Sequence, residues 1–293
     1  MNRFFECHPA VSALYFLSVL LVTMFTANPI LLALTLLGGV AFCATMESKK
    51  TSFKNLAFYV PLFIMIALTN PLFSHNGVTP LFFMNGNPIT LEAILYGIDI
   101  ATMLIAVMYW FKCFNYIMTS DKLLYLLGKV SPKISLVVSS ALRFIPLLKE
   151  QAKKIRQTQK AMGLYTSDSW LDKLRGTLRV YSSLITWSLE NAVDTGSSMK
   201  GRGYGLKGRS HFALFHFTCA DRILLAIIAC LDGIVFYSLF VGKLNFAFYP
   251  RISILEFGIY TLPAMIAFGL LSFLPFILEV KENMQWTYYR SKI

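Results

Sequence analysis

Charged residues are scarce in this chain of 293 residues, since Asp, Glu, Lys and Arg make up 14% of it, against about 25% in typical soluble domains. Hydrophobic residues make up 56% of the sequence, and Phe alone occurs 25 times. A soluble domain of this size cannot hide so much apolar surface, because its core stops growing while its surface must stay wet. The composition excludes a soluble enzyme, a disordered chain and a small disulfide scaffold. It predicts an all-α integral membrane protein.

Motifs that carry chemistry are also missing. The five cysteines form no CxxC pair, and we interpret them as small buried hydrophobic residues without a disulfide or a metal ion. Neither a P-loop motif nor an H-E-x-x-H motif is present, which excludes ATP hydrolysis by a P-loop and a zincin-type metal site. A G-x-G-x-x-G match at 203–208 follows a predicted helix instead of a strand, so it predicts no nucleotide site. We expect no catalytic residue, no cofactor and no bound metal.

Six apolar segments are candidates for membrane spans, and they cover approximately residues 10–27, 29–46, 56–73, 91–114, 222–241 and 254–279. Several have about 18–22 residues, which is enough to cross a hydrocarbon core of about 30 Å. The first two are near the short limit. We predict a polytopic protein with about six transmembrane helices. Residues 1–114 hold helices 1–4, residues 115–221 form a separate region, and residues 222–293 hold helices 5–6 and a short tail.

Basic residues are distributed very unevenly. Of the 27 Lys and Arg residues, 18 lie between Lys112 and Arg222, while the loop at 74–90 has none. If the N-terminus lies inside, six spans also return the C-terminus inside, and only Lys243 and Arg251 fall outside. The positive-inside rule therefore predicts that both termini and residues 115–221 are cytoplasmic.

Two long amphipathic helices are predicted within the basic region. The first begins at Ser131-Pro132, which suit the N-cap and N1 positions, and ends at Gly163, which suits a C′ position. The second begins near Ser167–Ser169 and ends at 201–203. Its apolar residues recur at steps of three and four and predict one helix-packing face, which we call the apolar stripe. The stripe consists of Leu171, Leu174, Leu178, Tyr181, Ile185, Leu189, Ala192, Gly196 and Met199.

The residues alone leave the role of these helices open. Two surface helices could lie on lipid with their basic residues facing anionic headgroups. They could equally form a docking platform for an acidic protein face, because an arginine beside a helix-terminal glycine presents a fork of five donors to carboxylates. Nucleic acid is also a possible partner on charge alone, but no motif that reads it is present.

Two other classes of protein are the alternatives for the whole chain, namely a self-contained secondary transporter or channel and a membrane-bound enzyme. The acidic residues inside predicted spans are Asp99 and Asp232, which suit helix–helix hydrogen bonds or an ion relay.

Three sequence segments carry a family resemblance. They are Ser-Ser-Ala-Leu-Arg-Phe-Ile-Pro at 139–146, Gln-Lys-Ala-Met-Gly at 159–163 and Met-Lys-Gly-Arg-Gly-Tyr-Gly at 199–205. With these segments and its arrangement of spans, the chain resembles the transmembrane T component of energy-coupling factor (ECF) transporters, the CbiQ/EcfT family. The resemblance implies a bacterial or archaeal cell membrane and a subunit without catalytic residues of its own.

The resemblance also implies partners. Two ABC-type ATPase subunits, as a homodimer or a heterodimer, would receive the ends of the two amphipathic coupling helices. A small membrane protein, the S component, would bind a vitamin or a transition-metal ion and be moved by the T component. The lipid bilayer is the remaining partner, and no nucleic acid is expected.

Two short motifs are the candidate ATPase contacts that the resemblance implies. Motif 1 is Ala161, Met162 and Gly163, and motif 2 is Gly201, Arg202 and Gly203. The family pattern is Ala-Arg-Gly-like, so this chain has Met in place of Arg in motif 1 and Gly in place of Ala in motif 2. This difference favours an unequal pair of ATPases. The candidate contacts for the S component are Val138, Leu142 and Ile145.

Overall fold

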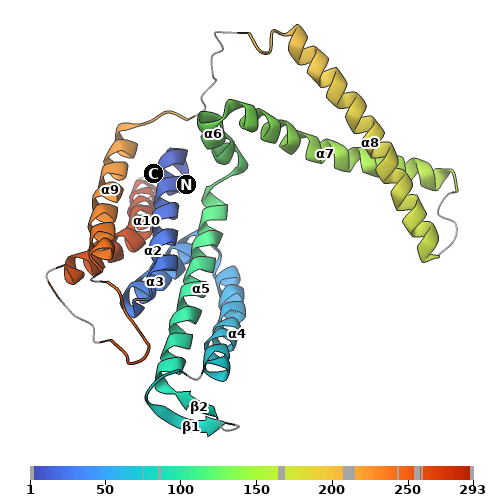
Figure 1. Cartoon of the computed structure of the whole chain (residues 1–293). Helices are drawn as coiled ribbons and strands as arrows, with labels where there is room; N and C mark the ends of the chain where they lie inside the picture. Colours follow the sequence, from blue (N-terminus) through green and yellow to red (C-terminus); the bar gives the residue numbers. More distant parts are fainter. Residues whose placement is uncertain are drawn as a thin grey trace. The chain divides into compact units, whose positions relative to one another are not determined.

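The structure is a computed structural model that describes residues 3–74, 76–84, 87–163, 169–206, 215–242, 244–253, 258 and 260–290. The chain forms two compact units, and each is considered by itself. The first unit comprises residues 1–123 and 215–293, and the second comprises residues 124–214. Figure 1 shows the helices of both units in sequence colours.

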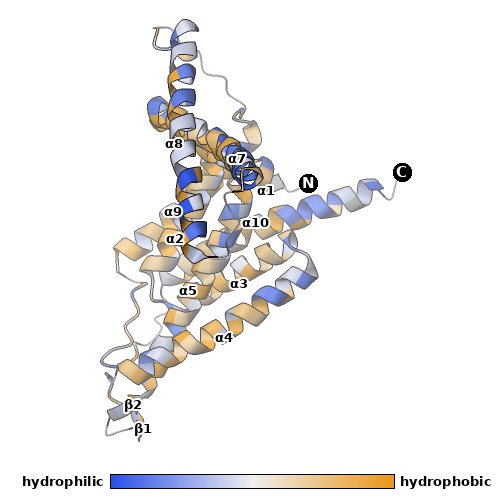
Figure 2. Cartoon of the chain, turned by 90° about the vertical axis from the view of Figure 1, so that its right-hand side faces the viewer, coloured by the Kyte–Doolittle hydropathy of each residue, from blue (hydrophilic) through white to orange (hydrophobic). Residues whose placement is uncertain are grey.

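The first unit is a bundle of apolar helices. Its helices are α1 (Arg3–Glu6), α2 (Pro9–Phe25), α3 (Pro29–Met46), α4 (Lys49–Phe73), α5 (Leu91–Ile117), α9 (Cys219–Phe240) and α10 (Thr261–Arg290). Among the described residues, five helices are long and apolar enough to cross a membrane, namely α3, α4, α5, α9 and α10. The helix α2 is apolar but has 17 residues. Figure 2 shows these helices mostly in the hydrophobic colour, and the expectation of an all-α polytopic membrane protein is confirmed.

Local signals in the sequence begin these helices. The helix α3 starts with Pro29 at N1, and the N-cap side chain of Asn28 accepts a hydrogen bond from the Ile30 N–H at 3.1 Å. At α9, Thr218 and Asp221 form a reciprocal capping box. Such caps satisfy donors that the first helical turn leaves without partners, which is why Asn, Thr and Asp are favoured there.

A cluster of aromatic rings forms the centre of the first unit. Tyr15, Phe16 and Trp110 are fully or almost fully buried and meet edge to face, with ring centroids 5.4–6.0 Å apart. The Trp110 Nε1–H donates to the Thr35 carbonyl at 3.1 Å, so its polar atom is satisfied where water is excluded. At Gly38 of α3, an added Cβ would lie 2.7 Å from the Ser272 carbonyl oxygen of α10. This glycine therefore permits a close approach of the two backbones.

Two features of the first unit differ from the expected spans. A hairpin of two short antiparallel strands, β1 (Pro80–Met84) and β2 (Asn87–Thr90), lies between α4 and α5, where only a loop was expected. The helix of the sixth span begins at Thr261, whose Oγ1 accepts from the Gly258 N–H at 2.6 Å. Residues 254–257 and 259, which belong to the expected span, lie outside the described residues.

The second unit consists of long helices that carry the basic residues. The helix α6 (Ser120–Val130) leads into it from the first unit, followed by α7 (Pro132–Ala161) and α8 (Trp170–Gly201). Ser131 is the N-cap of α7 with Pro132 at N1, as predicted, although the Ser131 side chain makes no capping hydrogen bond. The helix continues through Pro146. Ser169 is the N-cap of α8, and residues 167–168 of the expected cap region lie outside the described residues.

The packing face of α8 differs from the one expected from the apolar stripe. The helices α7 and α8 cross (Figure 1), and the buried residues of α8 are Gly176 and Val180, which do not belong to the stripe. Leu178, Tyr181 and Leu189 of the stripe are about 60% exposed. Two straight helices that cross touch over only part of their length, and small residues at the crossing let the backbones approach. The prediction that the stripe packs the two helices together is therefore wrong, and most of the stripe is an exposed apolar surface.

Candidate functional site

Motif 1 forms the C-terminal end of α7. The helix ends at Ala161, and Met162 is the C-cap residue, whose N–H donates to the Thr158 carbonyl at 3.0 Å. Gly163 follows at φ +74°, which is the left-handed conformation that glycine adopts without a steric penalty. All three residues are exposed, and the Met162 side chain is 72% accessible. The prediction that Gly163 is the C′ residue of this helix is confirmed.

Motif 2 forms the C-terminal end of α8 in the same way. The helix ends at Gly201, Arg202 is the C-cap residue, and Gly203 follows at φ +80°. The Gly203 N–H donates to the Lys200 carbonyl at 3.0 Å, and the Tyr204 N–H donates to the Met199 carbonyl at 3.0 Å. These two bonds are a complete Schellman motif, which satisfies carbonyls at the helix end. The backbone beneath Arg202 is thus held in a defined conformation.

The two motifs therefore share one frame and differ in one side chain. In each, the middle residue is an exposed C-cap followed by a left-handed glycine. Arg202 can offer five N–H donors to carboxylates of a partner, whereas Met162 offers a flexible apolar side chain. The arrangement can bind a partner surface, but it holds no pair of groups suited to proton transfer or nucleophilic attack.

The candidate S-component contacts lie together on α7. Val138 is half-buried, Leu142 is 39% exposed and Ile145 is 47% exposed. Their spacing of four and three residues places them on one face of the helix. They form an accessible apolar patch, and the structure brings none of them into the two coupling motifs.

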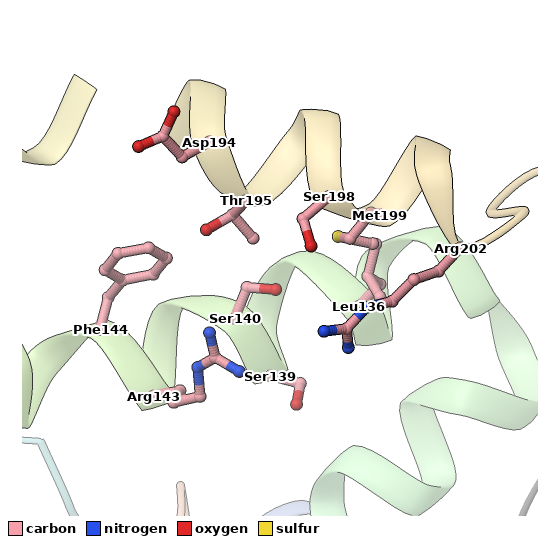
Figure 3. A pocket seen from close by; sticks show the side chains of 10 residues that line it. All are labelled: Leu136, Ser139, Ser140, Arg143, Phe144, Asp194, Thr195, Ser198, Met199 and Arg202. Atoms are coloured by element: carbon pink, nitrogen blue, oxygen red, sulfur yellow. The ribbon is translucent and has the colours of Figure 1, made fainter. Parts of the chain in front are cut away.

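The structure has an open cavity between α7 and α8 that the sequence analysis did not predict. Its volume is about 540 Å³. The lining comes from Leu136, Ser139, Ser140, Arg143 and Phe144 of α7 and from Asp194, Thr195, Ser198, Met199 and Arg202 of α8 (Figure 3). The α8 residues continue the face that is buried at Gly176 and Val180, so the cavity opens where the two helices diverge. The only signal in the sequence was that Ser139, Ser140 and Arg143 share the face of α7 opposite its apolar residues.

Metal binding has little support in the described part of the chain, where no group of three or more His, Cys, Asp or Glu side chains is placed to hold an ion. Cys43 and Cys113 are buried in the first unit, but Cys219 and Cys230 are exposed. The interpretation of all five cysteines as buried residues is therefore wrong for these two, because they lie on the outer surface of α9. His211, one of the two histidines near the end of the basic region, lies outside the described residues.

Comparison with known proteins places the chain in a family. A family model described as a cobalt transport protein, CbiQ, matches residues 4–214. The energy-coupling factor transporter transmembrane protein EcfT of Listeria innocua is 36% identical over 107 residues, which are 36% of this chain and 40% of that protein. The EcfT protein of Lactobacillus helveticus is 34% identical over 105 residues, 35% of this chain and 38% of that protein. The matched part therefore spans less than half of each relative. Because the family model covers most of the chain, this protein belongs to the CbiQ/EcfT family, the transmembrane T components of energy-coupling factor transporters.

Proposed function

We propose that this protein is the coupling subunit of an ECF-type ABC importer, which transmits ATP-driven motion from two cytoplasmic ATPases to a substrate-binding S component. The substrate would be a vitamin or a transition-metal ion, selected by the S component. The protein would have no catalytic role, because ATP hydrolysis would take place in the partner ATPases. Two findings support the proposal. The chain belongs to the CbiQ/EcfT family, and its relatives are named as transmembrane proteins of energy-coupling factor transporters.

The observation that carries the proposal is the equivalence of the two helix ends. Two separate helices of the second unit end in an exposed C-cap residue followed by a left-handed glycine. A left-handed glycine is a common helix end by itself, so the support comes from its recurrence beside an exposed middle residue at the ends of two helices. One such end for each ATPase would give the complex two contact points on one subunit.

The length of the helices suits them to transmit motion. With 30 residues in α7 and 32 in α8, each extends about 45–48 Å at about 1.5 Å per residue. The ladder of backbone hydrogen bonds, which in α7 lacks the donor of Pro146, makes each helix stiff in the axial direction, so a displacement at the motif is carried to the other end. Each Arg–carboxylate contact would contribute about 1.5–3 kcal/mol as a charge-assisted hydrogen bond.

The exposed apolar surface of the second unit suits it to hold a membrane partner. On α7 the patch of Val138, Leu142 and Ile145 is accessible, and on α8 the apolar stripe is accessible over most of its length. Exposed apolar surface of this extent marks a contact with lipid or protein. We assign the α7 patch to the S component.

The proposed orientation places both termini and residues 115–221 in the cytoplasm of a bacterial or archaeal cell, with the other helices spanning the cell membrane. The short segments support this orientation through the positive-inside rule, since only Lys243 and Arg251 would lie outside. The basic residues of the short inside segments are Arg3, Lys49, Lys50, Lys54, Lys281, Arg290 and Lys292. This orientation also puts motifs 1 and 2 on the side where ATP is available.

Affinity purification of the tagged full chain from its native membrane tests the proposal. We expect two ATPase-sized proteins and one small membrane protein to copurify, and uptake to require all of them. Transport by the purified chain alone in liposomes would show a self-contained transporter and would contradict the proposal.

A further inference from the structure

The open cavity between α7 and α8 gathers positive charge and hydroxyl groups in one place. Arg143 projects from α7 and Arg202 from α8, and Figure 3 shows both guanidinium groups turned toward the middle of the cavity. In the part of the chain that the structure describes, neither guanidinium forms an ion pair or a hydrogen bond. Two like charges that converge in a hollow repel one another and concentrate the local field, which favours an anion between them.

Hydroxyl groups add uncharged donors around the same space. Ser139 and Ser140 contribute them from α7, and Thr195 and Ser198 from α8. Within the described residues, none of these four hydroxyl groups donates or accepts a hydrogen bond. In Figure 3 the Ser140 hydroxyl lies between the two guanidinium groups in this view. Arginine forks together with hydroxyl donors match the oxygen atoms of a phosphate group.

The net charge of the lining sets the charge of the ligand. The lining contains two arginines and one carboxylate, Asp194, so its formal charge is +1. Asp194 lies at the other end of the cavity from Arg202 (Figure 3), which leaves the end at Arg202 positive. A phosphodiester carries one negative charge and would neutralise the lining.

Apolar side chains complete the cavity. Leu136 and Phe144 line it from α7 and Met199 from α8. A ligand that is anionic at one point and apolar next to it suits such a lining, and the exposed apolar surfaces of α7 and α8 suit contact with acyl chains. We propose that this cavity is a binding site for a phosphate group, supplied by the headgroup of an anionic phospholipid or by free phosphate, with Arg143 and Arg202 as its two cationic ligands.

The site is distinct from the surface assigned to the S component. At about 100° per residue, Val138, Leu142 and Ile145 point away from the face of α7 that carries Ser140 and Arg143. The proposal does not rest on the proposed function, because it concerns binding by the chain alone. The site shares one residue with motif 2, because Arg202 is both the C-cap residue of α8 and part of the cavity lining.

Native mass spectrometry of the purified full chain in detergent tests the site. Three probes are titrated separately: dioleoyl-phosphatidylglycerol, dioleoyl-phosphatidylcholine and inorganic phosphate. We expect phosphatidylglycerol to bind at least tenfold more tightly than phosphatidylcholine if the source is a lipid. Binding of inorganic phosphate with displacement of phosphatidylglycerol supports the site and identifies the phosphate group itself as sufficient. Failure of both phosphatidylglycerol and inorganic phosphate to bind overturns the proposal.

Substitutions locate the binding. Arg143→Gln should weaken binding of the phosphate probe about tenfold, since it removes one charge-assisted contact. Arg156→Gln is the matched control, because Arg156 is an exposed arginine on the same helix that does not line the cavity. Equal losses in the two variants would overturn the site. If Arg143→Gln fails to fold, the double variant Ser140→Ala with Ser198→Ala takes its place, with an expected loss of about threefold. The cavity could instead bind carboxylates of a partner protein. In that case Arg143→Gln would lose a copurifying acidic protein while phosphate binding stayed the same, and this result would also overturn the proposal.

Discussion

Met162 and Arg202 hold the same position at the ends of two different helices. Each is the C-cap residue of its helix, and each precedes a glycine with φ near +75 to +80°. Because the backbone frames match, exchanging side chains between these positions changes the contact surface without changing the fold of the helix end. The two positions therefore report separately on the two proposed ATPase contacts.

Reversing the charge of Arg202 should abolish association with one ATPase. In Arg202→Glu, a carboxylate faces the carboxylates proposed on the ATPase surface, so a favourable contact of about 1.5–3 kcal/mol is replaced by repulsion. Copurification of the ATPases and uptake in cells measure the effect, while membrane insertion should be unchanged. Lys200→Glu is the control, because it makes the same change of charge in the last turn of α8 outside the motif. Undiminished copurification of Arg202→Glu would contradict the role of motif 2.

Converting Met162 to arginine should preserve or strengthen docking at motif 1. Met162→Arg restores the usual family residue at a helix end with the same backbone conformation as motif 2, and a gain of up to about tenfold in ATPase affinity is expected if the ATPase surface there is acidic. Binding of the separately purified ATPases to immobilised variant and parent measures it. A complete loss of the complex would show instead that Met162 fills an apolar pocket, as expected of a partner adapted to methionine.

Alanine at Gly203 should destabilise the end of α8, whereas alanine at Gly196 should stabilise the helix. Gly203 has φ +80°, and an added Cβ would lie 3.1 Å from Leu206 Cδ1, so Gly203→Ala should cost about 1–2 kcal/mol. Gly196 lies within α8 with open space around it, so Gly196→Ala should gain about 0.5–1 kcal/mol. Hydrogen exchange at the end of α8 measures both, and ATPase affinity should fall only in Gly203→Ala. If the amides at the end of α8 are equally protected from hydrogen exchange in the two variants, Gly203 does not stabilise this helix end.

Much of the fold could be predicted because short local signals determine it. Pro29 after Asn28 and Pro132 after Ser131 mark helix starts, and Gly163 and Gly203 mark helix ends. These signals depend on the backbone conformations that proline and glycine permit, so they do not require knowledge of the rest of the molecule. The apolar runs likewise predicted membrane helices from composition and length.

The packing of α7 against α8 could not be predicted in this way. The apolar stripe looked like a packing face, yet Gly176 and Val180 are the buried residues of α8. In a soluble protein, periodic apolar residues face the core, but in a membrane protein they can face lipid or a partner equally well. The cavity of Arg143 and Arg202 escaped prediction for a related reason, since it depends on the angle at which two consecutive helices cross and diverge.

Placing a carboxylate on the apolar patch of α7 should separate the S component from the complex. Leu142→Asp puts a charge at an apolar contact, which costs about 2–4 kcal/mol when the contact is desolvated. The amount of S component that copurifies with the tagged chain measures the effect, and ATPase copurification should remain. Gln157→Asp, an exposed position on the same helix, is the control. Equal recovery of the S component with Leu142→Asp would place its contact elsewhere, for which the apolar stripe of α8 is the next surface to test.

Removing the charge of Asp221 should loosen the first unit where α2 and α9 begin. The Asp221 carboxylate accepts from the His8 N–H at 3.0 Å, from the Thr218 N–H at 2.9 Å and from the Thr218 hydroxyl at 2.7 Å. Asp221 is 5% exposed, so water cannot readily replace a lost partner. Asp221→Asn replaces one acceptor oxygen with an NH₂ donor that faces another donor, which should lower the free energy of unfolding by about 1–3 kcal/mol.

Thermal unfolding of the full chain in detergent measures this loss. Glu150→Gln is the matched control, because Glu150 lies on α7 and its ion pair with Lys154, at 3.0 Å, is exposed. Surface pairs of this kind contribute less than about 1 kcal/mol. A Tm for Asp221→Asn equal to that of the control would show that the link between His8 and Asp221 does not stabilise the bundle. A lower Tm with normal ATPase copurification would show that the link supports the membrane unit and not the coupling motifs.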